Sequence, residues 1–114
     1  MRSPENQVSQ VARAQQMVNS GSDEAGAALA LSIFENSRAS TGQEGALARR
    51  IYARAQLNLA NEAYEHGDTD LRDLCLSKAC REMEKAVEFY RKPENEGTFM
   101  LPDTLEEHAL LLAR

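Results

Sequence analysis

The sequence predicts an all-α protein built from antiparallel helical hairpins. Two glycines carry most of this prediction, because Gly21 and Gly67 each end one helical pattern and another begins within three residues. Aromatic residues make up 5% of the 114-residue chain and tryptophan is absent. A core of Ala, Leu, Ile, Val and Met suits closely packed helices better than a β-sandwich.

The first helix is expected from Pro4 or Glu5 to about Asn19. Ser3 is a suitable N-cap, and proline is favoured in the first turn of a helix. Residues spaced by three and four form one narrow apolar stripe, which consists of Val8, Val11, Ala12, Gln15 and Val18.

The second helix is expected to begin after Ser22 or Asp23. Its core pattern is Ala25, Ala28, Leu29, Ser32 and Ile33, flanked by Ala27, Ala30, Leu31 and Phe34. Because apolar residues cover most of its circumference, we expect this helix to be the most buried.

The third helix is expected to follow the break at residues 40–42 and to extend to about His66. Thr41 and Glu44 have the spacing of a capping box, and Gly67 is well placed as a left-handed cap. The predicted apolar face consists of Ala48, Ile51, Tyr52, Ala55, Leu59 and Ala63.

The fourth helix is expected to start after Asp68 or Thr69 and to stop just before Pro93. It has the clearest apolar seam of the four, made of Leu76, Ala79, Cys80, Met83, Ala86, Val87 and Tyr90.

The chain is predicted to form one helical hairpin domain over residues 1–92. Residues 93–114 are predicted to be a linker followed by a short C-terminal helix that begins near Pro102. Leu105, Ala109 and Leu112 would let that helix dock on the bundle, and a tail that extends from it is the alternative.

Charge and composition exclude several classes of function. The net charge is −5 and no long basic run is present, which argues against a nucleic-acid partner. No apolar run approaches about 20 residues and no signal-peptide pattern occurs, so we expect a soluble, cytoplasmic protein without a membrane partner. Cys75 and Cys80 would lie roughly 140° apart on a helix, which predicts two unpaired, buried thiols in a reducing compartment.

The second hairpin resembles the tetratricopeptide repeat, mainly over residues 50–92. The matching residues are Leu59, Ala60, Tyr64, Gly67, Asp68, Leu76 and Ala79. The sequence departs from the family pattern at Gln56, Arg72 and Glu84, where the family usually has an aromatic, a small residue and proline. The first hairpin keeps Ala14, Gly21 and Gly26 but has Arg13 where leucine is expected. The two glycine turns are 46 residues apart (21 to 67) instead of about 34, so the helices are longer than in the standard unit. A generic four-helix antiparallel bundle is the alternative fold.

Four polar residues of the third helix are candidate binding residues. Arg50, Arg54, Asn58 and Asn61 are spaced by four, four and three, so they share one face. The resemblance implies that this face lines a concave surface and grips the backbone and carboxylates of an extended peptide. The alternative interpretation is an ordinary solvated helix face.

No pattern indicates a metal site, a cofactor or catalysis. The segment DTDLRD lacks the alternating ligands of a calcium loop, and Glu62 and His66 have the wrong spacing for a di-iron bundle. No nucleophile motif or glycine-rich phosphate loop occurs. We therefore expect a non-enzymatic adaptor or chaperone-like module that binds a peptide or helix of a partner protein. The alternative is a structural or regulatory bundle that homodimerises through the Leu76 to Tyr90 seam or through the terminal leucines.

Overall fold

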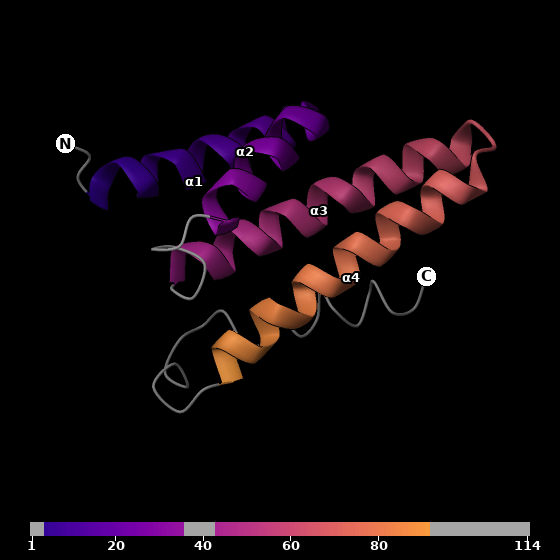
Figure 1. The fold of residues 1–114 in the computed structure, drawn as a ribbon. Coiled ribbons are helices and arrows are strands. Elements are labelled where there is room, and N and C mark those ends of the chain that lie inside the picture. Colours follow the sequence, from indigo (N-terminus) through magenta and orange to yellow (C-terminus); the bar gives the residue numbers. More distant parts are fainter. Residues whose placement is uncertain (1–3, 36–42, 92–114) are drawn as a thin grey trace.

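The computed structural model describes residues 4–35 and 43–91, with side chains described for residues 10–35 and 45–91. These residues form four helices and no strand, which confirms the all-α prediction (Figure 1). The helices are α1 (Pro4–Asn19), α2 (Asp23–Glu35), α3 (Gln43–Glu65) and α4 (Thr69–Arg91). The predicted capping residue Thr41 and the predicted linker and helix over residues 93–114 lie outside the described residues.

Both predicted glycine turns are present, and both have the same hydrogen-bond pattern. Gly21 and Gly67 have φ angles of 93° and 78°, a region that glycine enters without strain from a Cβ atom. After α1, the Ser22 amide donates to the Met17 carbonyl at 2.8 Å. After α3, the Asp68 amide donates to the Ala63 carbonyl at 2.9 Å. Each bond is the outer bond of a Schellman cap, which satisfies carbonyls that the helix end leaves without a partner.

Helix α3 is the central element of the fold. It packs against α1 and α2 on one side and against α4 on the other, whereas α4 packs chiefly against α3 (Figure 1). Among the described helices, the arrangement is therefore an open stack of two hairpins and not a closed ring of four. The prediction that α2 is the most buried helix is wrong. Helix α3 is covered on two sides, whereas only one side of α2 faces other helices.

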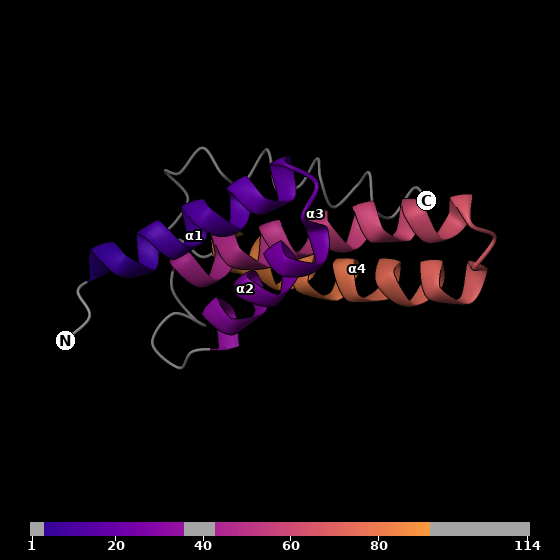
Figure 2. The same ribbon diagram turned by 90° about the horizontal axis from the view of Figure 1, so that it is seen from above.

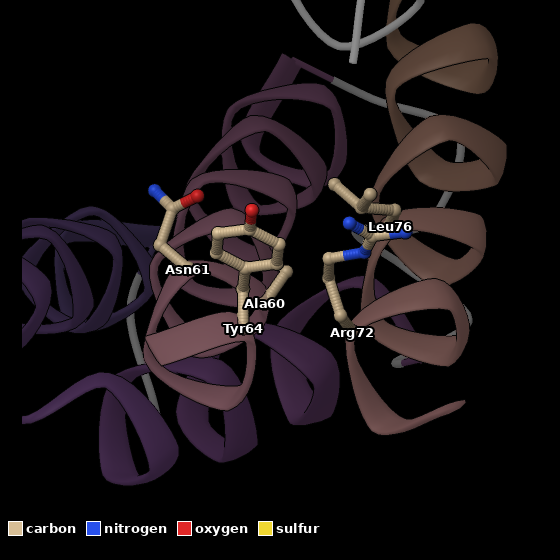
Figure 3. Close-up of a pocket in the computed structure, with 5 residues that line it drawn as sticks. All are labelled: Ala60, Asn61, Tyr64, Arg72 and Leu76. Carbon is tan, nitrogen blue, oxygen red and sulfur yellow. The ribbon is translucent and has the colours of Figure 1, made fainter. Parts of the chain in front are cut away.

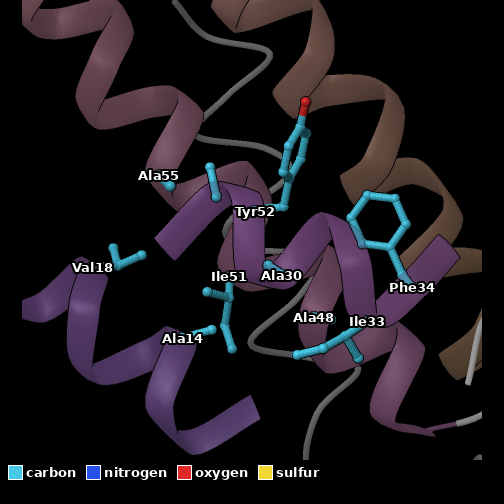
Figure 4. Packing of buried hydrophobic residues seen from close by; sticks show 10 residues of the cluster. Ala14, Val18, Ala30, Ile33, Phe34, Ala48, Ile51, Tyr52 and Ala55 are labelled. Carbon is cyan, nitrogen blue, oxygen red and sulfur yellow. The ribbon is translucent and has the colours of Figure 1, made fainter. Parts of the chain in front are cut away.

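The first part of the core lies between α1, α2 and α3. Figure 4 shows its side chains, which are Ala14, Val18, Ala30, Ile33, Phe34, Ala48, Ile51, Tyr52 and Ala55. The apolar face predicted for α3 is confirmed here, with Leu59 half-buried. Three alanines that were expected in the core, Ala12, Ala25 and Ala28, are exposed. Alanine carries little information about which side of a helix is covered, because it is an excellent helix former in any environment.

The second part of the core lies between α3 and α4. Ala53, Ala79 and Met83 are buried there, with Leu57, Leu76 and Cys80 packed against them. The seam predicted for α4 is thus largely confirmed, although Leu76 and Cys80 are only half-buried. Small side chains on facing positions let the two helices approach closely along their length.

The α3–α4 hairpin projects beyond the α1–α2 hairpin. Helices α3 and α4 have 23 residues each, against 16 and 13 in the first hairpin. Figures 1 and 2 show that the end carrying the Gly67 turn extends past α1 and α2. Three large apolar side chains on this end are exposed, with Tyr64 at 61%, Leu71 at 46% and Leu74 at 51%.

Gly26 sets the distance between α1 and α2. A Cβ atom at this position would lie 2.6 Å from Val18 Cγ2 and 3.2 Å from the Ala14 backbone oxygen. We predict that Gly26→Ala lowers the free energy of unfolding by about 1–2 kcal/mol through overpacking, although alanine is the better helix former by about 1 kcal/mol. Urea denaturation measures the change.

A double-mutant cycle with Val18→Ala identifies the cause. Removing the valine methyl groups should cost clearly less in the Gly26→Ala background than in the native chain, because the clash disappears with them. Additive effects, or stabilisation by Gly26→Ala alone, would contradict the close contact.

Candidate peptide-binding face

The polar residues predicted to bind a peptide lie on the side of α3 that neither core covers. Arg54 and Asn61 are exposed, and Arg50 and Asn58 are half-buried. Arg54 makes no ion pair with any described residue, so its guanidinium is available to a carboxylate from another molecule. Arg50, by contrast, already takes part in an interaction within the chain.

Asn58 has a structural contact that the sequence did not indicate. Its amide nitrogen donates to Asp23 Oδ1 at 2.9 Å in a partly buried position. Asp23 is the first residue of α2, so this bond ties the first turn of α2 to the middle of α3. The Asn58 amide donor is therefore engaged within the fold, although its carbonyl oxygen can still accept a hydrogen bond.

Asn61 lies at a depression between α3 and α4. The depression has a volume of about 220 Å³ and is lined by Ala60, Asn61, Tyr64, Arg72 and Leu76 (Figure 3). Figure 3 shows the Tyr64 ring between Asn61, on the same helix, and Arg72 and Leu76 on the other helix. Asn61 also takes part in an interaction within the chain. The site combines an apolar floor with an amide, a phenol and a guanidinium, which can together hold both a side chain and a peptide backbone.

Arg72 is held over this depression by two contacts. Its guanidinium carbon lies 5.3 Å from the centre of the Tyr64 ring, a cation–π arrangement. Its Nη2 atom donates to Asp73 Oδ1 at 3.0 Å. In the sequence, Arg72 stands out only as a departure from the tetratricopeptide pattern, and the pattern did not predict that it lies at the same depression as Asn61. Its helical position, one turn before Leu76, was the available signal.

A buried ion pair at the other end of the α3–α4 hairpin was also missed. Arg49 Nη1 donates to Glu82 Oε1 at 3.0 Å, and the two side chains are 14% and 8% exposed. The Arg49 guanidinium also stacks on Phe34, 4.7 Å from the ring centre, and Phe34 packs edge-on against Tyr52. Glu82 lies three and four residues from Ala79 and Ala86 in the predicted seam, and this spacing could have revealed it.

The two cysteines are unpaired, as predicted, with Cys75 buried and Cys80 half-buried. Burial is the main cause that raises the pKa of both thiols, and Glu84 raises the Cys80 pKa further. Cys75 and His66 line the same depression on the projecting end. A raised thiol pKa opposes formation of the thiolate that nucleophilic chemistry needs.

The acidic residues near the Gly67 turn have identifiable structural roles. Asp68 Oδ1 accepts a hydrogen bond from the Leu71 amide at 3.0 Å, which makes it the N-cap of α4. Within residues 10–35 and 45–91, no group of three or more His, Cys, Asp or Glu side chains is arranged to hold a metal ion. None of the four described helices combines the length and apolar composition needed to cross a lipid bilayer.

Comparisons of the chain with protein-family models, curated proteins and solved structures found no match. The resemblance to the tetratricopeptide repeat therefore stays a prediction. The binding face is argued below from the positions and contacts of its residues alone.

The ion pair between α3 and α4 gives a direct test of the packing. We predict that Glu82→Ala lowers the free energy of unfolding by about 3 kcal/mol, because the mostly buried Arg49 guanidinium loses this carboxylate, which Arg81 and Lys85 also approach at 3.7 Å. The double variant Arg49→Met, Glu82→Leu should recover most of this loss in urea denaturation. The exposed Glu88→Ala serves as the control and should change stability by about 0.5 kcal/mol or less. A loss at Glu82 no larger than at Glu88 would argue against the pair.

Stability should fall at alkaline pH. The pKa of Cys75, Cys80 and Tyr52 is raised in the folded chain, chiefly by burial. A raised pKa means that the folded state holds its proton more tightly, so these groups do not oppose folding below about pH 8.5. As the pH rises through the folded pKa values, stability is lost.

Urea midpoints between pH 7 and 10.5 should decrease, and they should decrease less steeply in the Cys75→Ala, Cys80→Ala variant. Equal slopes in both proteins would exclude the thiols as the cause.

Proposed function

We propose that this chain is a cytoplasmic, non-enzymatic interaction module, an adaptor or chaperone-like protein that binds a carboxylate-bearing peptide segment of a partner. The binding surface is the open face of α3 together with the depression between α3 and α4. The observation that carries the proposal is that Asn61 and Arg72 line one depression, with the exposed Tyr64 ring between them.

The chemistry of this face favours acidic and extended ligands. Arg54 and Asn61 are seven residues apart and lie about 20° from one another around α3, so both project from the same line. Arginine pairs with a carboxylate through a two-pronged hydrogen bond, and asparagine can pair with a peptide group. An apolar side chain of the ligand would fill the depression against Leu76 and Ala60. Asn58, tied to Asp23, would contribute chiefly by fixing the position of α3.

The alternative proposal is a homodimer that pairs through the α4 seam or through the terminal leucines, and the burial of the seam argues against the first of these two surfaces. Most of the seam expected to pair between copies is buried within the chain, including Ala79, Met83 and Tyr90. A dimer through this seam would have to open the contact between α3 and α4. The terminal leucines, the other route, lie outside the described residues.

A peptide array tests the proposed function. The probes are 12-residue peptides with one leucine each, in an acidic, a neutral and a lysine-rich series, and affinity is measured by fluorescence anisotropy. We expect Arg54→Ala, Asn61→Ala to weaken binding of the acidic series at least tenfold, because each lost charge-assisted or amide contact is worth roughly 1–2 kcal/mol. Binding should also weaken with added salt.

The control for this experiment is Arg13→Ala, Gln16→Ala, which removes a similar pair of exposed side chains from α1. It should leave the affinity unchanged. Both double variants alter exposed positions and should keep the native unfolding midpoint. Equal affinity of the acidic series for the native chain and the Arg54→Ala, Asn61→Ala variant would reject this face as the binding surface.

A further inference from the structure

A second depression lies on the other side of the projecting hairpin. It has a volume of about 370 Å³ and is formed between the first turn of α2, the last turns of α3 and the start of α4. Leu59 and Ala63 line it, and Leu59 lies roughly 140–160° around α3 from Asn61 and Tyr64. The two depressions are therefore separate surfaces.

The floor of this second depression is apolar and partly open to solvent. Leu59, Ala63, Leu71 and Cys75 form it. Leu71 is 46% exposed, and Leu74, three residues further along α4, is 51% exposed. Residues three apart on a helix are neighbours, so Leu74 lies next to Leu71 at the edge of the depression, and exposed apolar residues grouped in this way are typical of an interaction site.

Among the described residues, the charged or titratable groups on the rim are three carboxylates and one histidine. Glu24 from α2, Glu62 from α3 and Asp68 from the turn line the depression and His66 lies among them. Two of the carboxylates also serve the fold, because Asp68 caps α4 and Glu24 lies in the first turn of α2, where negative charge is favourable.

Glu62 has no such structural role. It lies in the last turn of α3, next to the negative end of the helix dipole, and no basic residue occurs in that turn. A carboxylate in this position is unfavourable to the helix, because it lies next to the negative end of the dipole. Its charge is compensated only if a cation approaches from outside the helix.

The charge of the rim decides between possible occupants. A second copy bound face to face would place carboxylates against carboxylates, which is unfavourable. Nucleic acid and anionic membranes carry the same sign of charge as the rim. An uncharged apolar segment would cover carboxylates without compensating them.

We infer that this surface binds a basic amphipathic segment of a partner protein, in which one or two large apolar side chains are flanked by lysine or arginine. The apolar side chain fills the depression against Leu59 and Leu71, and the flanking cations pair with Glu62, Glu24 and Asp68. This surface is independent of the acidic-peptide face proposed above, so one chain presents two docking surfaces of opposite charge.

The peptide series described above provides the probes for the test. The lysine-rich peptides with a leucine should bind the full chain at 50 mM NaCl, and binding should weaken at 300 mM. Glu62→Lys should weaken this binding at least tenfold, since it replaces attraction by repulsion. Glu65→Lys is the matched control, because it makes the same charge change in the same turn of α3 but does not line the depression. It should weaken binding less than threefold at 300 mM NaCl.

Further variants separate this inference from the proposed function. Leu71→Ser should also weaken the lysine-rich peptides, and replacing their leucine with alanine should do the same. Arg54→Ala, Asn61→Ala should leave their affinity unchanged. Circular dichroism establishes that each variant is folded. Equal losses with Glu62→Lys and Glu65→Lys, no dependence on the leucine, or a concentration-dependent dimer abolished by Leu71→Ser would overturn the inference.

Discussion

The whole arrangement depends on α3 being packed on two sides through alanine. Ala48 and Ala55 face the first hairpin, and Ala53 faces α4. Because alanine side chains are so small, neighbouring helix backbones can approach closely on both sides at once. Where α3 is covered on two sides, the stripe left to solvent is narrow, and this constraint places Arg54 on the open face.

The two ends of the α3–α4 hairpin are held very differently. At one end, Arg49 connects Glu82 on α4 with Phe34 on α2, so that three helices meet around one guanidinium. At the other end, the hairpin extends beyond α1 and α2 and ends at the Gly67 turn. Between these two ends, the hydrogen bond from Asn58 to Asp23 ties α3 to the first residue of α2. The smaller depression is lined by α3 and α4, whereas the larger one also borders the first turn of α2 through Glu24.

The projecting hairpin has two chemically different sides. One side presents arginine, asparagine and tyrosine around a small apolar depression. The other presents carboxylates around a larger one. Helix periodicity alone creates this contrast, because residues two apart on α3, such as Leu59 and Asn61, point in nearly opposite directions. A thin, two-helix element can therefore offer two surfaces to different partners, which suits the adaptor role proposed for the chain.

The sequence by itself determined the helices and their turns. Schellman caps at Gly21 and Gly67 and the N-cap at Asp68 are local interactions, made by residues within about five positions of one another, so their patterns are visible in the chain. Tertiary structure decided which side of each helix is covered. Ala14 is buried while Ala12 is exposed, and Asn58 and Glu82 meet partners 35 and 33 residues away. These outcomes depend on how helices cross, and an alanine-rich helix fits a neighbour on almost any side, so periodicity alone does not fix them.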